Sequence, residues 1–250
     1  MPLNGKVSVV TGGAGGIGRQ IALTLAKAGS AVAIVDINDK TGTAVATELQ
    51  AITTKAKFIQ CDLTKVVNIE NAFKDVKESF GTVDILVNCA GLTNRTPIEN
   101  ISEAEWDLLN SVNLKATFFA SQVAVKIMKA KHSGKIVSIS SLRAHVTDDK
   151  HTIYDVTKAG IEAMTRSFAV AFGKEHINVN AVAPGYVLTP MTRHNLDDAG
   201  WLDRLKSRVP LGRLVEMQEV ADAVLFMVSD SADAIAGQTL IIDGGRQVQD

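Results

Sequence analysis

Short runs of apolar and β-branched residues alternate along this chain with longer stretches in which apolar residues recur at helical spacing. Continuous apolar runs such as A-V-A-I-V and I-L-V are typical of strands that helices cover on both faces. This alternation predicts an α/β fold with a Rossmann-like, doubly wound parallel sheet. Seven strands are predicted, at Val7–Val10, Ala31–Asp36, Ala56–Gln60, Ile85–Asn88, Ile136–Ile139, Asn178–Val182 and Thr239–Ile242.

Two predicted helices, Ser111–Met128 and Tyr154–Phe172, carry apolar residues that are spread too widely for one buried stripe. The pattern therefore indicates a homodimer or homotetramer that buries part of these helices between subunits. The residues concerned are Val112, Phe118, Phe119, Val123, Ile127, Ile161, Met164 and Phe168. Residues 188–212 interrupt the alternation with apolar residues among charges, and we expect them to form a mobile lid over a substrate.

The length of 250 residues fits one domain, residues 1–250, that buries about three quarters of its unfolded surface. A net charge of -1 without a basic or acidic block argues against nucleic acid or an anionic membrane as a partner. The start M-P-L-N-G-K leads directly into the first strand, so we expect a cytoplasmic protein. Cys61 and Cys89 have no neighbouring ligand pair, which predicts reduced thiols and no metal site.

A glycine-rich run, T-G-G-A-G-G-I-G from Thr11 to Gly18, follows the first strand and opens a helix. Glycines there allow a tight turn and close approach of a pyrophosphate to the helix N-terminus. Five glycines in seven positions fit more than one spacing: Gly13, Gly15 and Gly18; Gly12, Gly16 and Gly18; or Gly12, Gly15 and Gly18. Arg19 is either a phosphate partner or a solvated helix residue.

Asp36 ends the second predicted strand, eighteen residues after Gly18. A carboxylate at that place accepts hydrogen bonds from the adenosine ribose hydroxyls of a dinucleotide and repels a 2′-phosphate. The cofactor expected from the sequence is therefore NAD rather than NADP.

A second set of residues has the chemistry of proton transfer. Tyr154 and Lys158 are four residues apart, so on a helix they share one face, and the ammonium favours the phenolate. Ser141 follows the predicted strand Ile136–Ile139 and offers a hydroxyl to a carbonyl or alcohol oxygen. Together with the nucleotide cradle, these three side chains indicate a redox enzyme.

With these motifs the chain resembles the short-chain dehydrogenase/reductase family in its short, single-domain form, over nearly all of its length. The resemblance implies the strand order 3-2-1-4-5-6-7. It implies that Tyr154 is the general base in alcohol oxidation, that Lys158 lowers the pKa of Tyr154 and holds the nicotinamide ribose, and that Ser141 orients the substrate oxygen. Asn113 in S-V-N-L is expected to anchor a water that relays protons, and Ser140 remains an alternative to Ser141.

The same resemblance implies the remaining cofactor contacts. They are Gly12, Gly16, Ile17, Gly18, Asp62, Leu63, Asn88, Ala90, Gly91, Pro184, Gly185, Val187 and Thr189, in addition to Asp36, Tyr154 and Lys158. Cys89 stands where the family's N-N-A-G element has a second asparagine. Asp155 stands where relatives carry a small residue, and we expect it to face solvent.

The loop between Ser141 and Tyr154 has many charges and no glycine, which disfavours a wide apolar acyl channel. Arg143, His145 and Arg95 suit a sugar, a polyol or a hydroxy acid, because arginine binds carboxylates through two hydrogen bonds. The leading hypothesis is an NAD-dependent dehydrogenase of a small polar secondary alcohol. The alternatives are a 3-oxoacyl-[acyl-carrier-protein] reductase and, less favoured, a nucleotide-sensing protein without catalysis.

Overall fold

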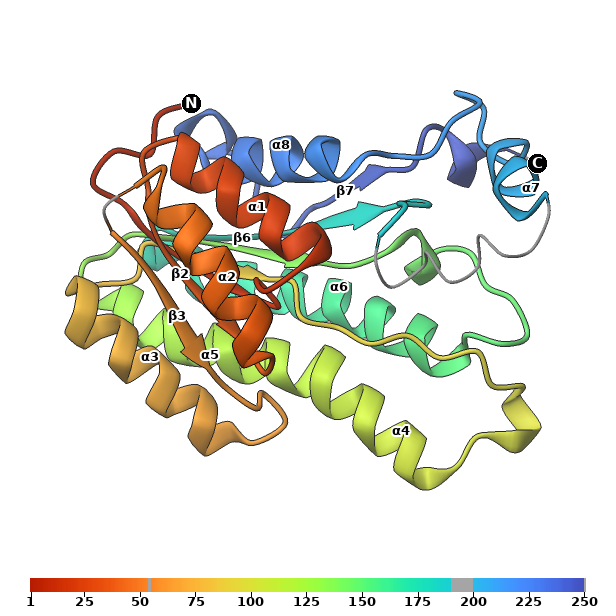
Figure 1. Cartoon of the computed structure of the whole chain (residues 1–250), viewed down its shortest axis with the longest axis horizontal. Helices are drawn as coiled ribbons and strands as arrows, with labels where there is room; N and C mark the ends of the chain where they lie inside the picture. Colours follow the sequence, from red (N-terminus) through yellow and green to blue (C-terminus); the bar gives the residue numbers. More distant parts are fainter. Residues whose placement is uncertain (54, 190–199, 250) are drawn as a thin grey trace.

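A computed structural model describes residues 1–53, 55–189 and 200–249. Seven parallel strands form one sheet in the order β3-β2-β1-β4-β5-β6-β7, as predicted (Figure 1). The strands are β1 Val7–Thr11, β2 Ala31–Asp36, β3 Ala56–Gln60, β4 Ile85–Asn88, β5 Gly134–Ile139, β6 Ile177–Pro184 and β7 Thr239–Ile242. The reversal of strand order between β1 and β4 leaves a crevice at the carboxyl ends of the strands, where ligands bind in sheets of this kind.

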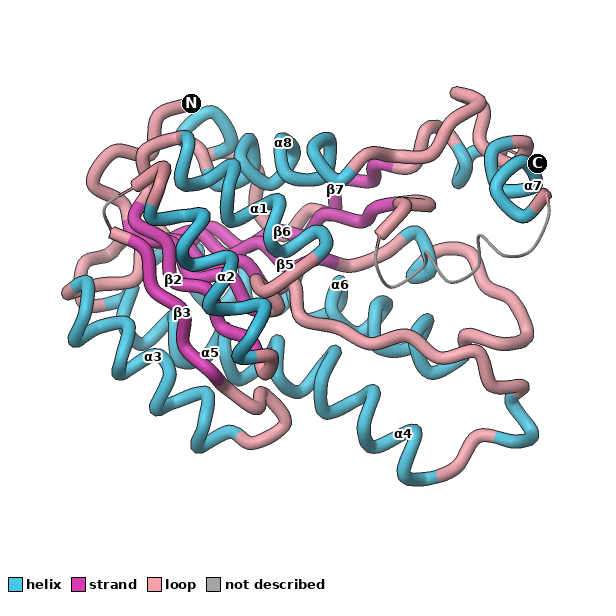
Figure 2. The backbone as a smooth tube through the Cα atoms, in the orientation of Figure 1, coloured by secondary structure: helices cyan, strands magenta, loops and turns pink. Residues whose placement is uncertain are grey.

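Helices cover both faces of the sheet (Figure 2). The α-helices are α1 Gly16–Lys27, α2 Asp39–Gln50, α3 Val66–Phe80, α4 Glu103–Leu109, α5 Ala116–Lys129, α6 Thr152–Phe172, α7 Trp201–Lys206 and α8 Met217–Val228. Helices α1, α2 and α8 lie on one face, and α3, α5 and α6 lie on the other.

Successive residues of one strand enter different hydrophobic cores, because side chains of a strand alternate between the two faces. Val9 of β1 belongs to the core with α3, α5 and α6, which includes the fully buried Phe73. Val10, the next residue, belongs to the core with α1, α2 and α8, which includes Ile21. Both faces are therefore sealed, as the uninterrupted apolar runs predict.

Strands β5 and β6 begin earlier than predicted. Gly134 and Lys135 pair with Ile177 and Asn178 at the start of both strands. The hydrophobic pattern does not mark these positions, because backbone pairing tolerates glycine and polar side chains there. A π-helical turn, Asn110–Lys115, also precedes α5, where one continuous helix was predicted from Ser111.

Part of the helix surface that was expected to form subunit contacts is buried within the single chain. Ile161, Met164 and Phe168 of α6 have exposed fractions of 7% or less. Phe168 packs edge-to-face against Phe118, with ring centroids 5.3 Å apart, and Phe118 itself remains 39% exposed. The core of the single chain therefore accounts for the apolar surface of these three α6 residues, while a subunit contact at Phe118 stays a prediction.

Residues 188–212 were predicted to form a lid, and 190–199 lie outside the described residues. The described remainder contains α7. Just before it, Val187 pairs with Val215 in an isolated parallel bridge.

Within the described ranges, no helix has the length and apolarity needed to cross a bilayer, and no three metal-ligating side chains cluster together. Burial raises the pKa of Cys61 to about 11 and that of Cys89 to about 12, so both remain thiols.

Candidate active site

The glycine run turns sharply between β1 and α1, and the structure leaves no room for side chains at Gly12, Gly13 and Gly18. A Cβ at Gly12 would lie 2.7 Å from Ala90 Cα, and one at Gly18 would lie 2.1 Å from the Gly12 carbonyl oxygen. Gly16 adopts φ +53°, which disfavours residues with a side chain. By contrast, a Cβ at Gly15 would meet nothing within 4 Å. Among the possible spacings, the structure therefore favours the one through Gly12, Gly16 and Gly18.

Asp36 stands beside this loop at the end of β2. Its Oδ2 accepts a hydrogen bond from the Ala14 amide at 3.1 Å, and its Oδ1 accepts one from the Asn38 amide at 3.1 Å. These bonds fix a negative charge next to the cradle, where the sequence analysis expects the adenosine ribose. Arg19, in contrast, makes a bidentate pair with Glu48, so the structure gives it a protein partner instead of a phosphate.

Asp62 lies after β3 and closes a turn. Its Oδ1 accepts hydrogen bonds from the amide and the hydroxyl of Thr64, at 3.0 and 2.7 Å. These bonds hold the pKa of Asp62 below its ordinary value. A contact with adenine therefore remains a prediction, and it would have to share this carboxylate with the turn.

The segment that follows β4 is held from two sides. Asn88 donates from Nδ2 to Ser121 Oγ and Ser138 Oγ, at 3.0 and 3.1 Å, while the amide of Cys89 donates to Thr11 Oγ1 at 3.1 Å. Asn88 thus supports the sheet, as the resemblance implies. The next residues, Ala90 and Gly91, pass directly over the glycine cradle and toward Lys158.

Asn113 lies in the π-helical turn, a local widening that is frequent at functional sites. Its Oδ1 accepts from the Leu92 amide at 2.7 Å, and its Nδ2 donates to the Leu92 carbonyl at 2.9 Å and to Thr157 Oγ1 at 3.1 Å. The side chain therefore ties the segment after β4 to α6. The predicted water relay at Asn113 stays a prediction, and its amide group is already fully engaged.

Reciprocal hydrogen bonds fasten α6 to the end of β5. Lys158 Nζ donates to the Ile139 carbonyl at 2.7 Å, and Ser140 Oγ donates to the Lys158 carbonyl at 3.2 Å. Ser140 Oγ also bonds Glu162 Oε1 at 2.9 Å. Of the two serines considered from the sequence, Ser140 is therefore committed to supporting α6, and its neighbour Ser141 is the one directed to Tyr154.

Ser141, Tyr154 and Lys158 come together as predicted. Ser141 shares a hydrogen bond with Tyr154, and Lys158 Nζ lies 5.4 Å from the centre of the tyrosine ring. Burial lowers the pKa of Lys158 to about 8, so the ammonium form still dominates at neutral pH. Burial raises the pKa of Tyr154, although the Ser141 hydrogen bond acts in the opposite direction. The protein alone therefore does not produce the lowered tyrosine pKa that was expected, because loss of hydration outweighs the Ser141 hydroxyl and the Arg143 charge.

A cavity of about 620 Å³ opens beside this set. Its wall includes the predicted residues Ile17, Arg95, Ser141, Arg143, Tyr154, Pro184, Gly185, Val187 and Thr189. It also includes Asn94, His151, Tyr186, Trp201, Arg204 and Arg208, none of which the sequence analysis assigned to the site. For Trp201, Arg204 and Arg208, the only indication in the sequence was that they lie within the predicted lid, residues 188–212.

Arg143 faces a cluster of protein groups. Its guanidinium bonds Asp148 and lies 2.6 Å from His151 Nδ1, and its Nε is 3.9 Å from Asp155 Oδ1. His145 Nε2 lies 3.0 Å from Glu162 Oε1, and His145 is not part of the cavity wall. His145 thus points to a core carboxylate and away from the cavity. Arg143 lines the cavity and is already paired within the chain, so a substrate contact of Arg143 stays a prediction. The sequence does not reveal these contacts, because Glu162 is distant from His145 in the chain and the Arg143 contacts depend on how the loop folds.

The expectation that Asp155 faces solvent is wrong. Its side chain is 9% exposed, and neither carboxylate oxygen has a hydrogen-bond partner. The attraction of Arg143 at 3.9 Å does not offset the loss of hydration, and burial raises the pKa of Asp155 to about 6. A carboxylate adjacent in sequence to Tyr154 is therefore held in an unfavourable environment.

Known proteins are similar to this chain over nearly its whole length. The family model described as Enoyl-(Acyl carrier protein) reductase matches residues 12–247. The chain is 35% identical over 245 residues to 3-oxoacyl-[acyl-carrier-protein] reductase of Thermotoga maritima, covering 98% of this chain and 99% of that protein. It is 36% identical over 248 residues to NAD-dependent glycerol dehydrogenase of Listeria innocua, covering 98% and 94%.

A solved structure agrees over the whole chain. Gluconate 5-dehydrogenase of Burkholderia cenocepacia, in complex with NADP and tartrate, superposes with a TM-score of 0.95 at 31% identity, covering 100% of this chain and 98% of that one. Fold, site and similarity define a nicotinamide-dependent α/β oxidoreductase. The chain belongs to the short-chain dehydrogenase/reductase family. It is an oxidoreductase that transfers a hydride between its cofactor and the alcohol or ketone carbon of its substrate.

The buried carboxylate of Asp155 generates a pH-dependent prediction. Because its folded pKa is raised from 3.8 to about 6, the unfavourable contribution is absent below pH 3.8 and complete above pH 6. Asp155→Asn keeps the shape and removes the charge. We expect its melting temperature to exceed that of the native protein at pH 7.5, on the order of a few degrees, with the difference disappearing toward pH 4.

Asp149→Asn is the matched control, because Asp149 is an exposed carboxylate in the loop just before α6. Thermal unfolding followed by circular dichroism from pH 4 to 8 measures the difference. An Asp155→Asn protein that is destabilised equally at pH 4 and pH 7.5 would show that the carboxylate is well accommodated.

Proposed function

We propose that this protein is an NAD(H)-dependent dehydrogenase of a small polar secondary alcohol, such as a sugar, a polyol or a hydroxy acid. The observation that carries this proposal is the meeting of Ser141, Tyr154 and the buried Lys158 beside the glycine cradle, with Ser141 and Tyr154 in the wall of the cavity. A bound nicotinamide dinucleotide supplies the hydride acceptor or donor. The glycine positions where a Cβ would clash fit the close backbone approach that its pyrophosphate requires.

The proposed division of work assigns each polar group one task. Tyr154 takes the hydroxyl proton during oxidation, Ser141 holds the same oxygen, and Lys158 keeps a positive charge beside the phenol. Asn113 anchors the proton relay. The residues proposed to hold the cofactor are Gly12, Gly16, Ile17, Gly18, Asp36, Asp62, Leu63, Asn88, Ala90, Gly91, Tyr154, Lys158, Pro184, Gly185, Val187 and Thr189.

NAD is favoured over NADP by the position of Asp36. Its carboxylate is fixed beside the cradle by two backbone amides, and a 2′-phosphate there would meet a negative charge. The glycerol dehydrogenase relative is NAD-dependent by name, whereas the gluconate 5-dehydrogenase structure contains NADP. Arg19, a basic group near the loop, is occupied by Glu48, which further disfavours a phosphate partner.

A 3-oxoacyl-[acyl-carrier-protein] reductase is the second candidate, because a relative with that name covers the whole chain. The charged cluster of Arg143, Asp148 and His151 in the cavity wall speaks against an apolar acyl chain. Acetoacetyl-CoA with NADPH or NADH is the assay substrate for this candidate. Turnover of that thioester, together with inactivity on polyols and hydroxy acids, would make the reductase the correct function.

We also propose that the protein acts as a homodimer or homotetramer. Apolar side chains remain exposed on α4, α5 and α6, on the side of the molecule away from α1, α2 and α8. Trp106 is 43% exposed, Phe118 39% and Val170 86%. Exposed large apolar side chains can mark a surface that a second subunit covers.

The proposed chemistry predicts the effect of removing one hydroxyl. Tyr154→Phe should reduce kcat by on the order of 10² to 10⁴, while binding of NADH, followed by its fluorescence, is retained. Tyr186→Phe is the control, since Tyr186 is the other tyrosine of the chain and also lines the cavity. A folded Tyr154→Phe protein with native turnover would exclude Tyr154 as the base.

Cofactor preference should depend on Asp36. Asp36→Ala should lower the NAD-to-NADP ratio of kcat/KM by at least about tenfold, the effect of about 1.4 kcal/mol expected when hydrogen bonds to a charged group are lost. Asp75→Ala, which removes an exposed carboxylate on α3, should leave the ratio unchanged. If Asp36→Ala leaves the ratio as in the native protein, Asp36 does not contact the cofactor.

A further inference from the structure

The cavity beside Tyr154 has a cationic wall. Among its described lining residues are four arginines, Arg95, Arg143, Arg204 and Arg208, and one acidic residue, Asp148. The whole chain has a net charge of -1, so this excess of positive charge is local. A cleft lined by one sign of charge concentrates ligands of the opposite sign.

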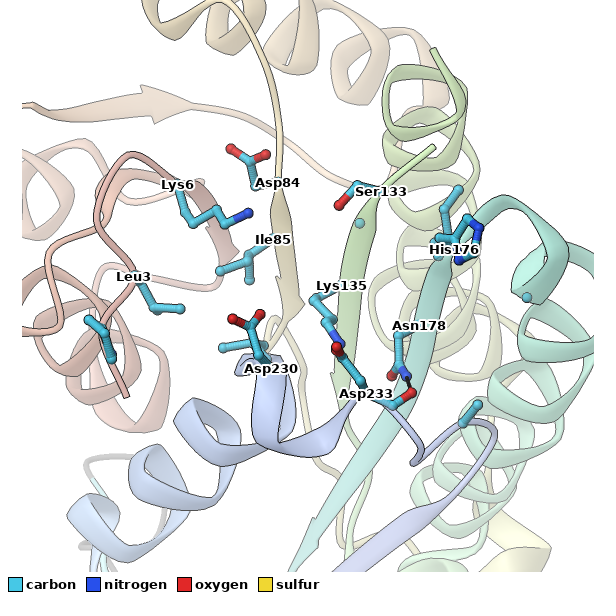
Figure 3. Close-up of a pocket in the computed structure, with 16 residues that line it drawn as sticks. Leu3, Lys6, Asp84, Ile85, Ser133, Lys135, His176, Asn178, Asp230 and Asp233 are labelled. Atoms are coloured by element: carbon cyan, nitrogen blue, oxygen red, sulfur yellow. Dashed lines mark hydrogen bonds and ion pairs between the residues drawn. The ribbon is translucent and has the colours of Figure 1, made fainter. Parts of the chain in front are cut away.

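The other end of the sheet provides a contrast. A cavity of about 350 Å³ lies where strands β4, β5 and β6 begin (Figure 3). Its wall combines Lys6 and Lys135 with Asp84, Asp230 and Asp233, and Lys135 pairs with Asp233. Positive charges there are balanced within the wall, so the cationic character belongs to the active-site cavity specifically.

The four arginines of the active-site cavity differ in whether other groups of the protein bind their guanidinium groups. Arg143 is held by Asp148 and His151, and Arg95 and Arg204 also have partners. Arg208 follows the end of α7, and its guanidinium makes no hydrogen bond or ion pair with the part of the chain that the structure describes. It is exposed at the cavity wall, where its five N–H donors suit a carboxylate.

Asn94 is an independent sign of a hydroxylated ligand. The residue is 8% exposed and lines the same cavity, and both its Oδ1 and its Nδ2 lack a partner. Buried amide groups are nearly always hydrogen-bonded, so an unpaired donor and acceptor at a binding cavity indicate a contact with a ligand group. A hydroxyl both donates and accepts, and rotation of the amide about its side-chain bonds would bring it to such a group.

From these observations we infer that the substrate is a polyhydroxy acid whose carboxylate is bound by Arg208 and one of whose hydroxyls is bound by Asn94. This inference rests on the proposed dehydrogenase function and narrows its substrate class from neutral sugars and polyols to anions. It also replaces Arg143, which the sequence suggested, with an arginine from the α7 segment.

A matched pair of probes isolates the carboxylate. Gluconate and sorbitol both have six carbons and a chain of hydroxyls, and differ in whether one end is a carboxylate or a hydroxymethyl group. The native protein should oxidise gluconate with a kcat/KM at least about tenfold above that for sorbitol, and added salt should lower the gluconate value selectively.

Arg208→Gln should raise KM for gluconate about tenfold or more and leave the sorbitol value within about twofold, because a charge-assisted contact acts on the anion alone. Lys206→Gln is the control: it removes a cation two residues away that does not line the cavity and pairs weakly with Asp203. Asn94→Ala should raise KM for both probes, since both carry hydroxyls. NADH binding should be unchanged in all three variants.

The outcomes separate the inference from the function on which it rests. Oxidation of sorbitol but not of gluconate, or equal effects of Arg208→Gln and Lys206→Gln, overturns the polyhydroxy-acid assignment and leaves the dehydrogenase intact. An unchanged KM for both probes in Asn94→Ala removes Asn94 from the substrate site. Inactivity of the native protein on the hydroxy acid and on every polyol and sugar tried, with activity on acetoacetyl-CoA, overturns the proposed function itself.

Discussion

One buried ammonium group holds the catalytic arrangement together. Lys158 is 4% exposed, and its Nζ donates to the carbonyl of Ile139, the last residue of β5. An isolated charge in such a place is unfavourable, and the hydrogen bond and the nearby tyrosine ring compensate for part of its lost hydration. The bond from Ser140 to the Lys158 carbonyl acts on the same helix turn. Because α6 is fixed at this point, Tyr154, one turn earlier, meets the hydroxyl of Ser141.

The two ends of the site carry opposite charge. Asp36 places a fixed carboxylate beside the glycine cradle, while the wall of the cavity beyond Tyr154 contains four arginines and one acidic residue. A dinucleotide without a 2′-phosphate suits the first end, and an anionic alcohol suits the second. Parallel strands bring both ends to one edge of the sheet, so in the proposed function the reacting carbon and the nicotinamide would meet between them. This polarity gives cofactor and substrate separate places without any movement of the sheet.

Much of this structure could be predicted from the sequence, because local signals are strong where the chain is buried. The strands β2, β3, β4 and β7 match their predicted bounds, since runs rich in apolar and β-branched residues mark β2, β4 and β7 and the alternating A-K-F-I-Q marks β3. The set of Ser141, Tyr154 and Lys158 follows from helix spacing and a strand end. The glycine spacing was ambiguous in the sequence; the contacts of a hypothetical Cβ at Gly12 and Gly18 and the positive φ of Gly16 distinguish the spacing in the structure.

The errors concern side chains whose environment is set by tertiary contacts. Asp155 was expected in solvent, yet the packing of α6 against the loop with Arg143 buries it. His145 is four residues after Ser141, but its ring meets Glu162 instead of the cavity. Arg208 and Asn94 belong to no sequence motif, so only their position in the cavity wall identifies them as candidates. Charge in a sequence thus indicates a polar site but does not say which charges are already paired.

The central claim, that the buried charge of Lys158 supports both the position and the chemistry of Tyr154, is tested most directly by kcat of Lys158→Met at pH 7. Methionine fills similar space without charge and without a donor for the Ile139 carbonyl. The account predicts a kcat lower by on the order of 10² or more in a protein that still folds cooperatively. A folded Lys158→Met protein that turns over at the native rate would contradict it.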